Sequence, residues 1–211
     1  MKKPCIKSGM ALTTLSLLLF CAVPHGQGAA RTYNLVAAES SFWVYVGKAG
    51  ILKGFAHNHE IGVKSFSGRI TVPAGNPAAG TLQLDVDAKS MAVLDKDVSD
   101  KDRTEIYNSM HNSVLESAKY PKISFRSVAV ADVKPAGANQ YSLTLSGDLT
   151  LHGVTRRIAV PATVNLTPNV LRATGKYTLR QSDYGIKPYS AAGGTIKVKD
   201  DIVVNFSLVA K

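Results

Sequence analysis

The feature that most constrains this chain is the alternation of apolar and polar side chains through residues 141–151. One parity is apolar and carries Tyr141, Leu143, Leu145, Leu149 and Leu151. The other parity carries hydroxyl and carboxylate side chains. A period of two places successive side chains on opposite faces of a β-strand. The sequence therefore predicts a strand with one apolar face and one solvated face.

The alternation stops at residues 152–155 and resumes with the apolar residues of 158–164. Gly153 lies in the interruption and can adopt the positive φ that tight turns require. Two alternating runs joined by a short turn are typical of a β-hairpin. We therefore predict that these two strands are neighbours and antiparallel.

Similar alternating runs fill most of the remaining chain. They occupy residues 33–46, 55–61, 66–72, 82–88, 123–127, 171–179 and 202–208. With the hairpin they predict an all-β fold of about eight antiparallel strands. Such strands can close into a barrel without exposed edges, wide enough for one small ligand, or can pack as a sandwich with no cavity. The alternation alone does not separate these two folds.

One segment has a different period and predicts a single inserted helix near residues 100–117. Ile106, Met110 and Val114 recur every four residues, which is the spacing of one helix face. Asp100 and Asp102 precede them, where negative charge stabilises the start of a helix. Pro121 then disfavours a helical conformation for the residue before it.

Residues 1–30 have the layout of a secretory signal peptide. Three lysines precede a mostly apolar run over residues 10–23, and small residues occupy 28–30. A run of about 14 residues is too short to span a membrane, which needs about 20. We therefore expect cleavage after Ala30, a mature domain of residues 31–211, and a periplasmic or secreted bacterial protein.

The cysteines and the net charge exclude several kinds of site. Cys5 and Cys21 both lie in the expected signal peptide, so the mature chain would have no disulfide and no thiolate metal site. Removing the three lysines of that peptide leaves 22 basic residues against 15 acidic ones, a net charge of about +7. The basic residues are scattered, which argues against nucleic acid as a partner and leaves an anionic membrane surface open.

Three segments, residues 119–127, 147–156 and 180–186, match a known pattern in order and spacing. They resemble the signature segments of the YceI-like family, and the resemblance extends over residues 32–210. It implies a lipocalin-like, eight-stranded antiparallel β-barrel with one inserted helix. It also implies an interior that holds a long apolar chain, such as a polyisoprenoid or another lipid. The chain departs from the family pattern around residues 55–60 and 102–112, so it looks like a divergent branch.

The alternation within each strand predicts which residues would surround such a ligand. The barrel wall is predicted to present inward the apolar residues Phe55, Phe66, Leu82, Leu84, Phe125, Leu149, Leu151 and Phe206. The mouth is predicted to use amphipathic or adaptable side chains, namely Tyr107, Met110, Tyr184 and Tyr189. Any folded barrel needs inward apolar residues as core, so a core role is the alternative for each wall residue.

A metal site is a second hypothesis. His57 and His59 project from one side of a predicted strand and lie about 7 Å apart along it. A third ligand would have to come from Glu60, His111 or His152. The alternative is that both histidines form hydrogen bonds that hold the barrel mouth.

We do not expect an enzyme. The chain has no Gly-x-Ser-x-Gly segment, phosphate-binding loop or nucleotide fingerprint. Asp148 lies on the solvated parity and is expected to bind backbone or an arginine such as Arg126. The place of His152 in the family motif suggests a hydrogen bond that stabilises its turn.

These observations predict a binding protein that sequesters or carries a long-chain apolar molecule, either a polyisoprenoid, a quinone-like molecule or a fatty-acyl lipid. No cofactor besides such a lipid is expected. The alternatives are a metal-binding module built on His57 and His59, or a barrel that acts through a protein or membrane partner. The oligomeric state, including a dimer, is left open.

Overall fold

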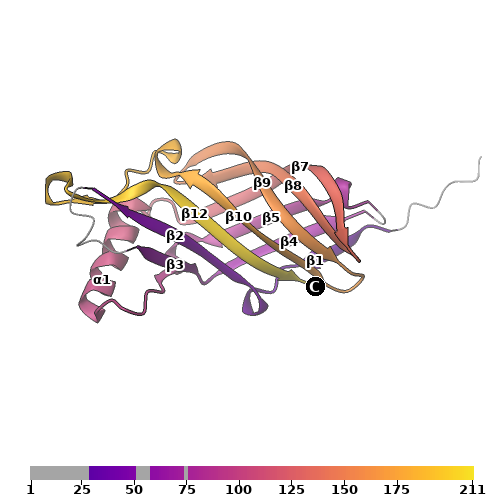
Figure 1. Ribbon diagram of the computed structural model, residues 1–211, viewed down its shortest axis with the longest axis horizontal. Helices are drawn as coiled ribbons and strands as arrows, with labels where there is room; N and C mark the ends of the chain where they lie inside the picture. Colours follow the sequence, from indigo (N-terminus) through magenta and orange to yellow (C-terminus); the bar gives the residue numbers. More distant parts are fainter. Residues whose placement is uncertain (1–28, 51–57, 74–75) are drawn as a thin grey trace, which may run out of the picture.

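A computed structural model describes residues 29–50, 58–73 and 76–211 (Figure 1). The expected signal peptide therefore lies almost entirely outside the described residues. The strands in chain order are β1 Arg31–Asn34, β2 Ser41–Ala49, β3 His59–Val63, β4 Phe66–Val72, β5 Thr81–Asp87, β6 Met91–Val93, β7 Lys122–Gly137, β8 Gln140–Leu151, β9 Val154–Leu166, β10 Leu171–Arg180, β11 Ser190–Ala191 and β12 Ile196–Ala210. The helical segments are η1 Ala37–Glu39, η3 Pro77–Ala79, η4 Ala88–Ser90, α1 Asp100–Ser109, η5 Met110–Val114, η6 Gln181–Tyr184 and η7 Ala192–Gly194.

The alternating strands form one antiparallel sheet that curls back on itself. Its order is β1-β4-β5-β7-β8-β9-β10-β12-β2-β3-β6, with β11 added to β12. Leu35 bridges Ala210, and the backbone N–H groups of Asn34 and Lys211 each donate to the carbonyl oxygen of the other, at 2.6 and 2.9 Å. The first strand therefore meets the last one, beside the C-terminus in Figure 1. The sheet is a barrel, and the sandwich alternative is wrong.

The described residues form twelve strands and not eight, because three long strands are interrupted and the short β11 is added to β12. The turn η1 separates β1 from β2, and η4 separates β5 from β6. In η4 the Asp87 side chain accepts from the Lys89 N–H at 2.9 Å, which bends the chain locally. Residues 64–65 separate β3 from β4. These pieces follow one another around the barrel, so the expected eight-stranded plan is kept.

The predicted hairpin is confirmed. β8 and β9 pair from Gln140 opposite Asn165 to Leu151 opposite Val154. The turn residues His152 and Gly153 have φ values of 51° and 75°. Positive φ at both positions matches the right-handed twist of the strands and makes a tight hairpin.

The inserted helix is also confirmed, with a change of geometry near its end. The Ser99 hydroxyl caps α1 by accepting from the Asp102 N–H at 3.1 Å. After Ser109 the chain forms a wider π-helical turn, η5, in which the Leu115 N–H donates to the Met110 carbonyl oxygen at 2.8 Å. The wider turn supplies both Met110 and Val114 to the barrel interior. Within the described residues, no helix has the length and apolar character that would let it cross a membrane.

Candidate functional site: an apolar cavity

The barrel encloses a cavity of about 290 Å³, a volume near the lower end of the range for ligand pockets. Inward-facing side chains of β2–β10 and β12 line it, and Met110, Val114 and Leu115 cover its helical end. Many of these apolar residues are only half-buried, including Leu145, Val160 and Val204. They are half-buried because they face the cavity and not a neighbouring side chain. The interior is therefore hollow.

Two inward glycines help to keep it hollow. A Cβ on Gly175 would lie 2.5 Å from a ring carbon of Phe206 and 2.6 Å from the Pro161 carbonyl oxygen. A Cβ on Gly147 would clash with the ring of Phe125 and lie 2.6 Å from a backbone oxygen of the neighbouring strand. Both phenylalanines line the cavity. Because the glycines have no side chain, the two rings lie against the wall and leave the centre open.

Four of the nine predicted ligand-binding residues lie on the cavity wall: Leu84, Met110, Phe125 and Leu149. Of the other inward residues, Leu82, Leu151 and Phe206 also line it. Whether these side chains contact a ligand stays a prediction.

Five predicted ligand-binding residues are placed elsewhere or not described. Phe66 packs edge-on against Phe42, with ring centroids 5.7 Å apart, and lies off the wall. Tyr107 and Tyr189 are exposed on the surface. Tyr184 is fully buried within a cluster behind the wall. Phe55 lies outside the described residues.

Sequence reasoning missed three cavity residues with a distinct character. Phe42 faces inward from β2, where both parities are apolar and the pattern is ambiguous. Tyr177 and Gln181 bring polar atoms to an otherwise apolar wall. The signal for Gln181 was available, because it continues the inward parity of β10 through Tyr177 and Leu179.

Tyr177 and Tyr184 both have raised pKa values. Burial, the main cause, and the nearby Tyr177 raise the pKa of Tyr184 to about 12. Burial and the charge of Asp183 raise the pKa of Tyr177. Both phenols are therefore neutral at physiological pH. No described residue forms a hydrogen bond with the buried Tyr184 hydroxyl.

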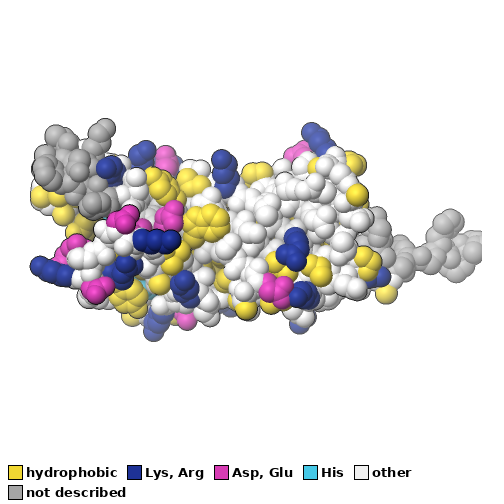
Figure 2. Space-filling model, turned by 60° about the horizontal axis from the view of Figure 1, so that its bottom comes forward, with side chains coloured by type: hydrophobic (Ala, Val, Ile, Leu, Met, Phe, Trp, Pro, Cys, Tyr) yellow, Lys and Arg dark blue, Asp and Glu magenta, His cyan; other side chains and the backbone are white. Residues whose placement is uncertain are grey.

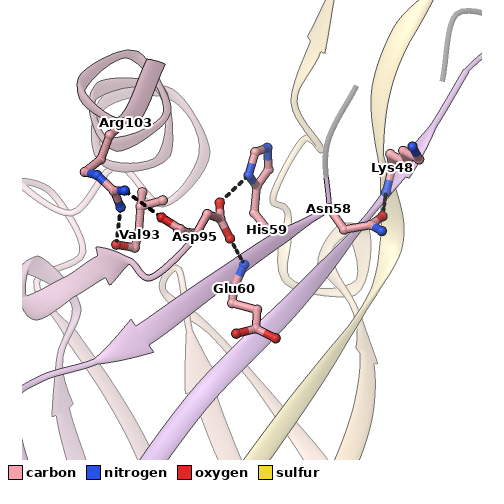
Figure 3. A network of polar contacts seen from close by, with 7 residues as sticks. All are labelled: Lys48, Asn58, His59, Glu60, Val93, Asp95 and Arg103. Carbon is pink, nitrogen blue, oxygen red and sulfur yellow. Dashed lines mark hydrogen bonds and ion pairs between the residues drawn. The ribbon is translucent and has the colours of Figure 1, made fainter. Parts of the chain in front are cut away.

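His59 takes part in a hydrogen-bond network on the barrel surface (Figure 3). Its Nδ1 lies 2.7 Å from Asp95 Oδ2, and the other oxygen of Asp95 accepts from the Glu60 N–H at 2.7 Å. Arg103 donates to the carbonyl oxygens of Val93 and Asp95 at 3.0 and 2.5 Å. The network ties β3 to the connection between β6 and α1.

Two of the three candidate third ligands, His111 and His152, are already bound to protein groups. The His111 ring lies 2.9 Å from Ser117 Oγ and 3.0 Å from the Met91 carbonyl oxygen. His152 Nε2 lies 2.8 Å from Glu116 Oε2. Across residues 29–50, 58–73 and 76–211, no three His, Cys, Asp or Glu side chains are grouped as metal ligands. His57 lies outside those residues, so the paired-histidine site stays a prediction.

Asp148 binds an arginine, as expected, but the arginine is Arg157 and not the example given, Arg126. Arg157 donates to both carboxylate oxygens of Asp148, at 2.6 and 3.1 Å, and lowers the pKa of that carboxyl. Arg126 instead binds Asp85 at 2.6 Å. Burial acts to raise the pKa of Asp85, but the hydrogen bonds from Arg126 and Lys122 hold it below its usual value. Both pairs lie on the outer face of the barrel, and none of their side chains lines the cavity.

Charged side chains are unevenly distributed on the face shown in Figure 2. They gather toward the end of the molecule that holds α1, and basic and acidic groups are interspersed there. This face therefore has no continuous basic surface. Binding to an anionic membrane stays a prediction.

Comparisons with known proteins agree with this architecture. The family model described as "YceI-like domain" matches residues 33–210. A protein called "UPF0312 protein" from Pseudomonas savastanoi is 29% identical over 216 residues, which cover 98% of this chain and 99% of that protein. Another from Pseudomonas putida is 32% identical over 143 residues, or 63% of this chain and 66% of that protein.

Two solved structures are similar in fold. BcnA from Burkholderia cenocepacia has a TM-score of 0.64 at 23% identity, covering 84% of this chain and 99% of that one. A domain from Saccharophagus degradans, described as a polyisoprenoid binding domain, has a TM-score of 0.61 at 17% identity, covering 85% and 97%. Because the family model covers most of the chain, this protein belongs to the YceI-like domain family.

Proposed function

We propose that this protein binds a long-chain apolar molecule, an isoprenoid or related lipid, inside its barrel and sequesters or carries it. The single observation that carries the proposal is the hollow, apolar cavity within the sheet. Among the described residues that line it, only Thr81, Tyr177 and Gln181 have polar side chains. The polyisoprenoid-binding description of the Saccharophagus domain supports the same ligand class.

Apolar burial would provide the binding energy. Each methylene group removed from water contributes about 0.8 kcal/mol. Ten buried methylenes would therefore supply about 8 kcal/mol before the entropic costs of binding. Because this contribution depends on length and not on polar groups, we expect selection mainly by chain length and width.

The same cavity favours a binding role over an enzymatic one. A general acid, base or nucleophile must lie within hydrogen-bond reach of the reacting group. None of the described cavity-lining residues is an acid, a histidine, a lysine, a serine or a cysteine. We therefore propose that the bound molecule is held and released without chemical change.

We also propose that the chain is exported and acts in the periplasm or outside the cell. The support is the charged, apolar and small-residue layout of residues 1–30. N-terminal sequencing of the protein produced in a bacterial host tests this. A mature chain that begins at Arg31 in the periplasmic fraction is expected, and an uncleaved chain retained in the cytoplasm would contradict it.

Native mass spectrometry and organic extraction test the binding proposal. Leu145 lines the cavity, whereas Thr144 is its neighbour on the opposite parity of β8. Leu145→Trp should fill the cavity and abolish the co-purifying lipid, and Thr144→Trp should retain it. A wild-type protein that neither co-purifies with lipid nor binds added lipid would overturn the proposal, as would full lipid content in folded Leu145→Trp.

Metal binding remains a second candidate because of one observation. Asp95 fixes Nδ1 of His59, and Figure 3 shows the other ring nitrogen directed away from Asp95. A carboxylate on one imidazole nitrogen commonly orients the other toward a metal. A zinc-sized mass shift in native spectra, lost in His59→Ala, would support this candidate. A metal-free spectrum after incubation with zinc would contradict it.

A further inference from the structure

The strands β9 and β10 part in the half of the barrel that holds the helix. Their pairing runs from Leu171 opposite Leu166 to Gly175 opposite Ala162 and then stops. The next pair would contain Pro161, which has no N–H to donate to the ladder. Beyond this point the turn η6 connects the two sides, because Arg156 of β9 donates through Nε to the carbonyl oxygen of Asp183. A turn and side chains therefore close the wall here in place of a β-ladder.

The turn η6 directs one face inward and the other outward. Side chains three residues apart eclipse one another in a 3₁₀ turn, which places Gln181 and Tyr184 on the same face. These two are 5% and 2% exposed, whereas Ser182 and Asp183 are exposed. Ser182 anchors the outer face, since its N–H and hydroxyl donate to the Asp200 carboxylate at 2.8 and 2.5 Å.

The inner face of η6 carries hydrogen-bonding capacity that the protein does not use. Gln181 lines the cavity and donates through Nε2 to the Lys199 carbonyl oxygen at 2.9 Å. No described residue donates to its Oε1. Tyr184 packs against Leu151, Leu179 and Ile186, all of which line the cavity. Its hydroxyl has no partner among the described residues, although leaving a buried hydroxyl unpaired costs about 1–3 kcal/mol.

We propose that Tyr177 and Gln181, which both line the cavity, form a polar subsite that binds a neutral hydroxyl or carbonyl group at one end of the apolar ligand. Tyr184 lies behind the wall and does not contact the ligand. This inference rests on the proposed lipid-binding function and adds the chemistry of the ligand's polar end. The Tyr177 phenol can donate, and the Gln181 carbonyl can accept. The apolar part of the ligand would lie along the wall formed by β7–β9.

The surroundings favour a neutral group over a charged one. Burial penalises a charge of either sign. Two opposite charges lie near the subsite, Arg156 and Asp183, and they affect the pKa of Tyr184 in opposite directions. Their fields therefore offset each other and do not compensate for the burial of a phosphate or carboxylate.

A matched pair of probes tests the subsite: 1-dodecanol and dodecane, each competed against a fluorescent apolar dye. In Tyr177→Phe the affinity for dodecanol should fall roughly fivefold to tenfold, since one net hydrogen bond is worth about 1 kcal/mol. The affinity for dodecane should stay unchanged. Tyr184→Phe, which removes a hydroxyl behind the wall, should change neither affinity. Tyr45→Phe, which alters an exposed tyrosine on β2, should affect neither probe.

The stability of the ligand-free protein gives a second readout. If the Tyr177 hydroxyl serves the ligand, Tyr177→Phe should be as stable as the wild type, whereas a purely structural hydroxyl would make the variant less stable. If the wild type binds dodecane but Tyr177→Phe weakens both probes equally, or neither, the subsite is overturned and the lipid-binding proposal stands. If the folded wild type binds neither probe, both proposals fall.

Discussion

The two ends of the barrel are closed in different ways. At the C-terminal end, backbone hydrogen bonds join Asn34 to Lys211, and Tyr33, Val72, Leu171 and Ala210 form a compact buried cluster. At the helical end, side chains hold the covering elements. Met110, with Ile106 and Leu115 beside it, packs in the buried cluster that contains Val44, Ile61 and Val86. Hydrogen bonds add to this packing: His111 with the Met91 carbonyl oxygen, His152 with Glu116, and Ser182 with Asp200.

This difference indicates where the barrel can open. A β-ladder must break several backbone hydrogen bonds together, whereas the described contacts between the helical cover and the wall are made through side chains, which can separate without breaking a ladder. Local opening should therefore be less costly at the helical end. Since Tyr177 and Gln181 also lie in that half of the cavity, we expect a ligand to pass through this end and the opposite end to act as the fixed base.

The largest predicted effect concerns the fixed base. Tyr33 is 3% exposed, and its hydroxyl donates to the Thr167 carbonyl oxygen at 2.9 Å. Tyr33→Ala should lower the free energy of unfolding by about 3–5 kcal/mol, as large-to-small substitutions of buried aromatic residues do. Tyr33→Phe, the matched control, should lose only about 1 kcal/mol. Urea denaturation measures both, and equal losses would show that the base depends on the hydroxyl and not on packing.

A second prediction uses the raised pKa of Tyr184 at the helical end. Burial raises the folded-state pKa of Tyr184 to about 12 from the usual 10. The stability that depends on a neutral Tyr184 is therefore fully present below pH 10. It is lost as the pH rises from about 10 to 12, with a total loss of at most about 2–3 kcal/mol. Urea denaturation across this pH window should show that the wild type loses unfolding free energy while Tyr184→Phe does not lose this contribution. If the difference in unfolding free energy between the two proteins does not change with pH, the Tyr184 phenol is not buried.

The barrel plan could be predicted from the sequence because alternation and turn chemistry are local. The hairpin of β8 and β9, with Gly153 in its turn, follows from a period of two and a positive φ. The helix follows from a change of period. Both signals are contained in a few neighbouring residues, so tertiary contacts did not override them.

The cavity details could not be predicted in this way because they depend on pairs that are distant in sequence. The ring of Phe206 lies over Gly175 only because β10 and β12 pair in that register. Tyr184 was expected at a mouth, but η6 turns its side chain into a buried cluster. Asp148 lies opposite Arg126 on β7 and Arg157 on β9, and Arg157 binds it while Arg126 pairs with Asp85 on β5.

The third prediction tests whether the glycines keep the cavity open between the two ends. Gly175→Ala should force the Phe206 ring away from the wall, because the new Cβ would lie 2.5 Å from it. Overpacking of this kind costs about 1–3 kcal/mol, and lipid capacity should fall as the ring enters the cavity. Adding Phe206→Leu to Gly175→Ala should restore part of the binding. If Gly175→Ala binds dodecane as the wild type does, the rings do not control the open volume.

The smallest predicted effect concerns one side-chain contact at the helical end. His152→Asn keeps a residue that tolerates the φ of 51° at this turn position but removes the contact with Glu116. The free energy of unfolding should fall by only about 0.5–1 kcal/mol, because Glu116 is partly exposed. Dissociation of dodecane in stopped-flow measurements should nevertheless accelerate, since Glu116 follows the π-helical turn that covers the cavity. An unchanged rate in this variant, together with a faster rate in Tyr33→Phe, would place the opening at the C-terminal end and reverse the comparison.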